Sequence, residues 1–213
     1  PVKAGHEALD RWDLEKAIKI GEVLKGGGLE NAGDDALFYL ARLEFFRGNY
    51  ATSLSYLKRM GASSKEPETK KFTEQVEKLA KITEDFISFE SEHFILRLKK
   101  GSDEILAEDS LYALERAYDA LTMDFGLTPK VKVVVEILPS VKALNIATGL
   151  SEKDVENSGT IAVCKFGRIM VTTPRVLLRG YAWQDTLSHE FVHYLIYLKA
   201  GPNCPIWLHE GIA

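Results

Sequence analysis

Two histidines and a glutamate lie in one short segment, where His189, Glu190 and His193 form the pattern H-E-x-x-H. The surrounding stretch from Thr186 to Leu198 is largely apolar, which indicates a helix. Because a helix turns once per ~3.6 residues, the two histidines share a face and can direct their imidazoles at one metal ion. Glu190 can approach the same centre without binding the metal and take a proton from water. This spacing is typical of a zinc hydrolase.

An alternative is a surface helix that carries two unrelated histidines. The residues between and after the histidines are Phe191, Val192 and a run of further apolar side chains. The helix is therefore expected to be mostly buried, and buried histidines need partners. The pattern favours the metal site.

A catalytic zinc site needs a third protein ligand, and the segment from Pro205 to Ala213 supplies candidates. Pro205 suits the start of a second helix, which would contain Glu210. His209 is a rival ligand, but neighbouring helical positions point about 100° apart, so only one of the two can face the metal. Cys204 is a further rival at the turn before this helix.

The H-E-x-x-H pattern followed by P-x-W-L-x-E-G-x-A resembles the gluzincin metallopeptidases, specifically the peptidase-MA-like group related to aminopeptidase N and thermolysin. The resemblance implies that His189, His193 and Glu210 bind one zinc ion and that Glu190 is the catalytic base. It is strong over residues 186–213 and looser, a matter of pattern and order, over residues 86–185. The substrate implied by the resemblance is a peptide or protein.

The same resemblance implies that residues 86–213 are the N-terminal part of a gluzincin domain, truncated at its C-terminus, with a small mixed sheet and the zinc helix. The residue that stabilises the oxyanion would then lie beyond residue 213. Repeat-fused relatives of this group are often exported bacterial proteins, so a periplasmic or cell-envelope location is also implied.

Composition excludes several other classes of protein. The chain has 213 residues, 46% of them hydrophobic, which suits one large domain or two small ones. A formal net charge of −4 gives no indication of nucleic-acid binding. No apolar run approaches the ~20 residues of a transmembrane span. The two cysteines, Cys164 and Cys204, do not settle the redox compartment.

Residues 1–85 have the apolar spacing of helical hairpins. One helix is expected around Leu37 to Phe45 and a second after the break at Gly48-Asn49-Tyr50. This arrangement resembles a tetratricopeptide repeat (TPR), with Asp13 to Ile18 in the second helix of a preceding, incomplete unit. A plain helical bundle is the alternative. A repeat-like module would dock a protein partner or substrate.

From Phe86 onward the pattern changes to alternation. Strands are expected at Phe89 to Leu98 and Lys130 to Leu138, separated by a long helix from Asp103 to Phe125. Thr160 to Cys164 and Arg168 to Thr172 are expected to form a hairpin across Lys165-Phe166-Gly167.

In the gluzincins, the strand before the zinc helix is an edge strand that binds the substrate backbone. The residues expected in that role here are Gly159, Thr160, Ile161, Ala162, Val163 and Cys164. The alternative is an ordinary inner strand.

The sequence thus predicts an α+β chain in which a helical TPR-like module (1–85) precedes a zinc metallopeptidase domain (86–213). The expected function is zinc-dependent peptide hydrolysis. The rival function is a non-catalytic interaction scaffold that retains the metallopeptidase fold only as structure; the intact Glu190 argues against it, because a structural site has no use for a base.

Overall fold

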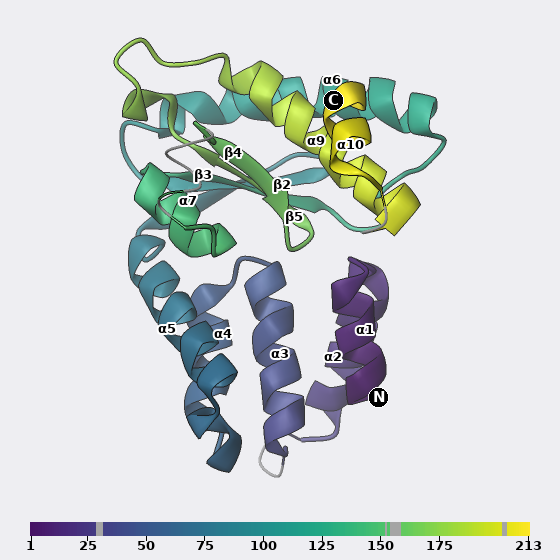
Figure 1. The fold of residues 1–213 in the computed structure, drawn as a ribbon, viewed down its shortest axis with the longest axis vertical. Helices are drawn as coiled ribbons and strands as arrows, with labels where there is room; N and C mark the ends of the chain where they lie inside the picture. Colours follow the sequence, from purple (N-terminus) through teal and green to yellow (C-terminus); the bar gives the residue numbers. More distant parts are fainter. Residues whose placement is uncertain (29–31, 152, 154–158, 202–203) are drawn as a thin grey trace. The chain divides into compact units, whose positions relative to one another are not determined.

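The computed structural model describes residues 1–28, 32–151, 153, 159–201 and 204–213. The chain divides into two compact units, Pro1–Glu84 and Asp85–Ala213 (Figure 1). The described residues of the first unit contain helices and no strand, and every described strand begins at Phe86 or later. The predicted α+β class is therefore confirmed. A membrane-spanning helix is absent from the described part of the chain.

The described residues of the first unit form successive helices. Asp13 begins the second helix by accepting a hydrogen bond from the Lys16 backbone N–H, and Pro67 occupies the first turn of the last. The elements are α1 (Val2–Asp10), α2 (Leu14–Gly26), α3 (Asp34–Phe46), α4 (Tyr50–Arg59), a 3₁₀ turn (Ala62–Lys65) and α5 (Pro67–Ile82).

The first hairpin of this unit is complete, which corrects the prediction of an incomplete unit. Helix α1 precedes α2 and packs through Leu9 and the small residues Gly5 and Ala8. These small residues allow close packing, since a Cβ built on Gly5 would lie 2.4 Å from the Tyr39 ring of α3. The Tyr39 hydroxyl donates a hydrogen bond to the Ala17 carbonyl of α2 at 2.6 Å. Tyr39 thus joins α1, α2 and α3.

The second unit is built on a five-stranded mixed sheet with the order β1-β2-β3-β5-β4. The central pairs β2–β3 and β3–β5 are parallel, and the outer pairs are antiparallel. The strands are β1 (Phe86–Glu90), β2 (Phe94–Lys99), β3 (Val133–Leu138), β4 (Ala162–Lys165) and β5 (Arg168–Thr172). Strand β4 therefore lies at an edge of the sheet.

The single strand predicted from Phe89 to Leu98 is wrong, because a turn divides it into β1 and β2. The Ser91 N–H donates to the Phe94 carbonyl at 3.1 Å, and the His93 N–H donates to the Glu115 carboxylate at 2.9 Å. The turn contains no glycine or proline, and a residue of a distant helix supports it. Local alternation therefore gave no sign of the break. Lys165 is likewise part of β4, so the second hairpin turns at Phe166-Gly167 alone.

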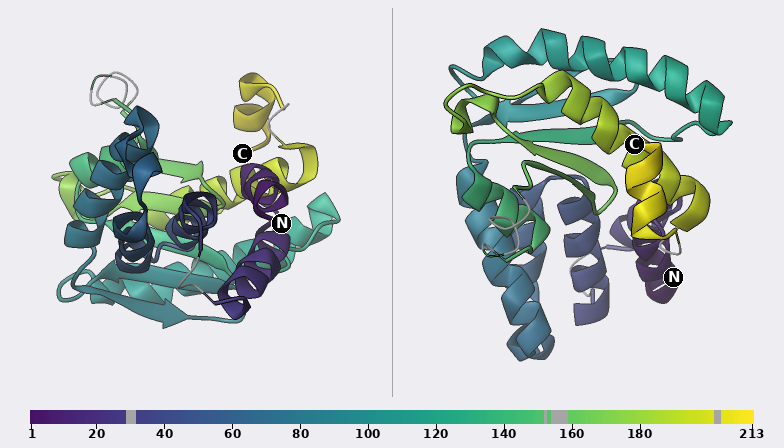
Figure 2. Two further views of the ribbon diagram at one scale, coloured as in Figure 1. Left: turned by 90° about the horizontal axis from the view of Figure 1, so that it is seen from below. Right: turned by 45° about the horizontal axis from the view of Figure 1, so that its top comes forward.

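Helices cover both faces of the sheet (Figures 1 and 2). Helices α6 and α9 lie on one face and α7 on the other. The long helix expected from Asp103 starts with a 3₁₀ turn, and α7 was not predicted. The elements are a 3₁₀ turn (Glu104–Leu106), α6 (Ala107–Phe125), α7 (Val141–Thr148), a 3₁₀ turn (Pro174–Val176), α9 (Trp183–Ala200) and α10 (Ile206–Ile212).

An aromatic cluster fixes α9 against the sheet and α6. The Phe191 ring of α9 lies 5.3 Å from Phe94 of β2 and 5.9 Å from Tyr118 of α6, measured between ring centroids. Phe191 is fully buried. At 100° per residue, Phe191 lies about opposite His189 and His193 on the helix. Its burial therefore presents both histidines on the side of α9 away from this cluster.

Candidate metal centre

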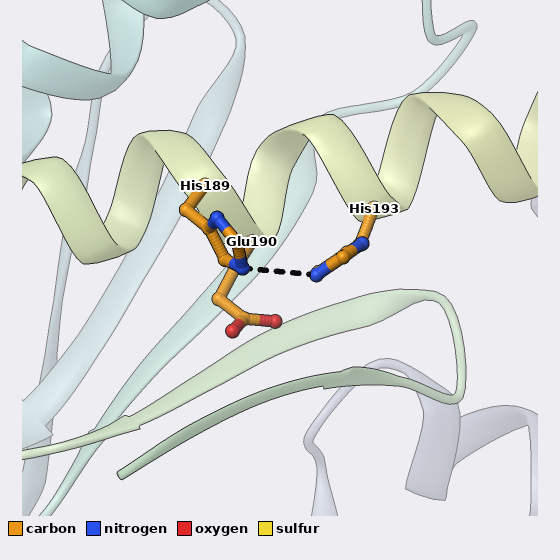
Figure 3. Close-up of side chains that lie close together, drawn as sticks. All are labelled: His189, Glu190 and His193. Atoms are coloured by element: carbon orange, nitrogen blue, oxygen red, sulfur yellow. Dashed lines mark hydrogen bonds between the residues drawn. The ribbon is translucent and has the colours of Figure 1, made fainter. Parts of the chain in front are cut away.

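The two histidines of α9 point at each other across one helical turn (Figure 3). Their Nε2 atoms are 3.1 Å apart, and the rings meet edge to face. His189, Glu190 and His193 each offer a ligand atom within 4.8 Å of the others. Two neutral imidazoles of the same tautomer would oppose two lone pairs or two N–H groups at this distance. A shared cation removes that conflict, because each Nε2 lone pair then faces positive charge.

The carboxylate of Glu210 reaches the same point from α10. Its Oε2 lies 3.8 Å from His189 Nε2, and its Oε1 lies 3.6 Å from His193 Nε2. Ligands about 2.0–2.1 Å from a tetrahedral zinc ion lie about 3.3–3.4 Å from one another. The spacings of the three side chains are close to this value, and two imidazoles with a carboxylate form a catalytic type of zinc donor set. The residues therefore fit a zinc ion.

Glu190 is held differently from Glu210. Its side chain is buried and turns toward the β4–β5 hairpin in Figure 3, whereas that of Glu210 is 60% exposed. Burial is the main cause that raises the pKa of Glu190 to about 7, and the nearby Glu210 charge adds to it. The backbone N–H of Cys164 hydrogen-bonds to the Glu190 carboxylate and opposes the rise. A carboxyl group with this pKa suits proton transfer near neutral pH.

The surroundings of His193 favour its neutral imidazole. Burial lowers its pKa, and the neighbouring His189 lowers it further, although Glu210 acts in the opposite direction. A metal binds the neutral imidazole, so a lowered pKa keeps the ligand form present at neutral pH.

The two rival ligands, His209 and Cys204, do not join His189, His193 and Glu210. His209 Nδ1 lies 3.4 Å from His193 Nδ1, the ring nitrogen on the other side from the cluster. The Cys204 thiol contacts the Pro205 carbonyl at 3.9 Å. Sequence reasoning missed two contacts, that of His209 with His193 and that of the Cys164 N–H with Glu190, and no sequence pattern indicates either.

The segment expected to bind substrate lies beside α9. Ala162, Val163 and Cys164 belong to edge strand β4, while Gly159, Thr160 and Ile161 precede it. The Ile161 carbonyl accepts a hydrogen bond from the Thr172 N–H of β5 at 2.8 Å. Backbone groups alternate along an antiparallel strand, so the N–H and C=O of Ala162 and Cys164 point away from β5. The Cys164 N–H uses this outward direction to reach Glu190.

No protein-family model, curated protein or solved structure matches this chain.

Replacing Glu190 with glutamine is expected to stabilise the metal-stripped protein at pH 8 more than at pH 5. The pKa of Glu190 in the folded protein is about 7, above the ordinary value of 4.5. The folded state therefore binds more protons than the unfolded state between pH 5 and pH 8. Wild-type stability should therefore fall as pH rises through this window, by up to about 3 kcal/mol. Glutamine carries no charge at either pH, so the variant does not lose this stability as the pH rises.

Denaturant unfolding of both proteins in the presence of a chelator measures this difference. An equal gap between them at pH 5 and pH 8 would show that Glu190 does not titrate in this range in the folded protein.

Proposed function

We propose that the unit Asp85–Ala213 carries the zinc centre of a gluzincin-type peptidase. In this proposal His189, His193 and Glu210 bind one zinc ion, and Glu190 is the general base. The observation that carries the proposal is the convergence of Glu210 on the two facing Nε2 atoms, at 3.8 and 3.6 Å. The three ligands come from two different helices, so a shared amphipathic pattern does not account for their meeting.

Zinc held by two histidines and a carboxylate lowers the pKa of water toward about 7 and polarises a carbonyl group. The protein's part is to orient the groups around that chemistry. Helix α9 fixes His189 and His193 through the buried Phe191. Helix α10 brings the Glu210 carboxylate, whose negative charge would offset part of the charge of a bound metal ion.

Glu190 would accept the proton of the attacking water and pass it to the leaving amine. Its pKa of about 7 makes both transfers accessible at neutral pH. The hydrogen bond from the Cys164 N–H fixes the carboxylate on the β4 side of the centre. A group placed there would serve a substrate that pairs along the edge of β4.

The outward backbone groups of β4 support a peptide substrate. An extended peptide can add to an exposed sheet edge by main-chain hydrogen bonds. Within β4, Ala162 presents both an N–H and a C=O outward, whereas the Cys164 N–H is engaged by Glu190. Ala162 is therefore the residue that we propose pairs with the substrate backbone, two residues from the one that holds the base.

The turns of the helical unit support a repeat-like arrangement of its hairpins. Both hairpins turn through a residue with positive φ, Trp12 at 56° and Gly48 at 72°. The next residue is in each case the N-cap of the second helix, Asp13 or Asn49. Such correspondence favours two copies of a TPR-like hairpin over an unrelated bundle. We propose that this module binds a protein partner or delivers substrate.

The rival function is a non-catalytic interaction scaffold in which the metallopeptidase fold serves only as structure. Glu190 argues against it. A buried carboxylate with a raised pKa costs stability, and a structural zinc site has no use for a base beside the metal.

Cleavage of a broad peptide library by the full-length protein tests the proposal. We expect hydrolysis that is lost after treatment with a chelator and restored by one zinc ion per chain. The zinc content of the purified and reconstituted protein is measured in parallel. A protein that binds zinc tightly yet cleaves no peptide would favour the scaffold.

A further inference from the structure

We infer that His209 is a positioning residue that sets the tautomer and orientation of the ligand His193. The inference rests on the proposed zinc centre and concerns a residue that the ligand set leaves out. His193 has neighbours at both ring nitrogens. Its Nε2 lies 3.1 Å from His189 Nε2 and 3.6 Å from Glu210 Oε1. Its Nδ1 lies 3.4 Å from Nδ1 of His209.

Counting protons decides the direction of this hydrogen bond. A neutral imidazole carries one hydrogen on either Nδ1 or Nε2. When Nε2 of His193 uses its lone pair for the metal, Nδ1 must carry the hydrogen and donate it. His209 then accepts through the lone pair of its own Nδ1 and carries its hydrogen on Nε2. The contact thus selects the His193 tautomer that can bind metal through Nε2.

The geometry does not suit His209 as a fourth ligand. Its nearest atom to His193 approaches the nitrogen on the far side of that ring from His189 and Glu210. The two ring planes are tilted by 39°, with centroids 5.5 Å apart. Neighbouring helical residues point about 100° apart. His209 and Glu210 therefore lie near different nitrogens of the His193 ring, Nδ1 and Nε2 respectively.

Packing does not account for the contact either. None of the residues of α10 is buried, and the His209 ring is partly exposed. Its aromatic neighbour is His193 itself, whose side chain is only 14% exposed. A partly exposed imidazole beside a partly buried proposed ligand is placed to orient that ligand. Partners of this kind contribute about 10–100-fold in metal affinity.

The zinc affinity of His209 variants tests this role, measured by competition with a chromophoric chelator. His209→Phe keeps a planar ring but accepts no hydrogen bond, and we expect affinity to fall by about 10–100-fold. His209→Asn retains an acceptor oxygen, and its affinity should return to within a few-fold of the wild type. Ile212→Ala, an exposed change on the same helix, is the matched control and should not alter affinity.

A spectroscopic signature separates positioning from a general effect on folding. In the zinc-loaded wild-type protein, the His193 Nδ1–H proton should give a protected, downfield NMR resonance. It should persist in His209→Asn and exchange into solvent in His209→Phe. Undiminished zinc affinity in His209→Phe would overturn the inference. Equal loss in the Phe and Asn variants would also overturn it, because it would make His209 a ligand.

These outcomes are distinct from failure of the proposed function. A wild-type protein that does not bind zinc refutes the metal centre itself, and the inference with it. A wild-type protein that binds zinc but hydrolyses nothing refutes the peptidase proposal. In that case the affinity series still decides the role of His209.

Discussion

Changing Glu190 to glutamine is expected to lower peptide hydrolysis by the full-length protein roughly 10²–10⁴-fold, which is the usual contribution of a general base. Zinc content should remain that of the wild type. Glutamine keeps the size of the side chain and an oxygen that can accept the Cys164 N–H. It cannot take a proton from water. The values of kcat/KM and the zinc stoichiometry of the two proteins measure the separation.

Two further carboxylate variants serve as controls for Glu190→Gln. Glu108→Gln removes a charge from an exposed position on α6 and should change neither activity nor zinc content. Glu210→Gln removes a charge from the proposed ligand and should weaken zinc binding. Full activity in Glu190→Gln would show that another group is the base. Loss of zinc in that variant would show that Glu190 is a ligand.

The environment of the two carboxylates explains why we assign them different roles. Glu190 and Glu210 both lie near His189 and His193. Glu190 is buried and hydrogen-bonded to the β4 backbone, so its carboxylate is already oriented by the protein. Glu210 is exposed, and the contacts of its carboxylate are the two imidazoles. We therefore propose Glu190 for proton transfer and Glu210 for metal binding.

The part of the site that lies on one helix could be predicted from sequence, because the period of the α-helix fixes it. The spacing of His189 and His193 is sufficient to place two imidazoles on one face. The position of Glu210 depends on how the chain returns after α9, which no local pattern encodes. Only the resemblance singled it out, and the structure brings it to the two histidines.

Features that depend on tertiary contacts were missed. The turn between β1 and β2 is held by Glu115, which is distant in sequence from His93. Helix α1 packs Gly5 against the Tyr39 ring of α3, a contact between residues far apart in sequence. The role inferred for His209 depends on which nitrogen of His193 it approaches. Each of these features depends on which distant residue is contacted. Hydrophobic periodicity indicates only the face of a helix or strand on which a residue lies.

His189→Ala is expected to remove both zinc and activity. Apparent binding free energies of structural zinc sites are about 10–16 kcal/mol, shared among the ligands. Loss of one protein ligand should therefore weaken zinc binding on the order of 10²–10⁴-fold, since 1.4 kcal/mol corresponds to a factor of ten. At submicromolar free zinc the variant should be largely metal-free and its hydrolysis undetectable. Zinc competition and the peptide assay on one preparation measure both effects.

His6→Ala is the matched control for this change. His6 is a histidine of the helical unit, where its Nδ1 lies 2.8 Å from the Arg42 guanidinium. Its loss should leave zinc content and hydrolysis unchanged, although the helical unit is expected to be less stable. Zinc bound by His189→Ala at wild-type affinity would place the metal elsewhere in the chain. Comparison with Glu190→Gln then separates zinc binding from proton transfer, because both variants lose hydrolysis and only His189→Ala loses the zinc ion.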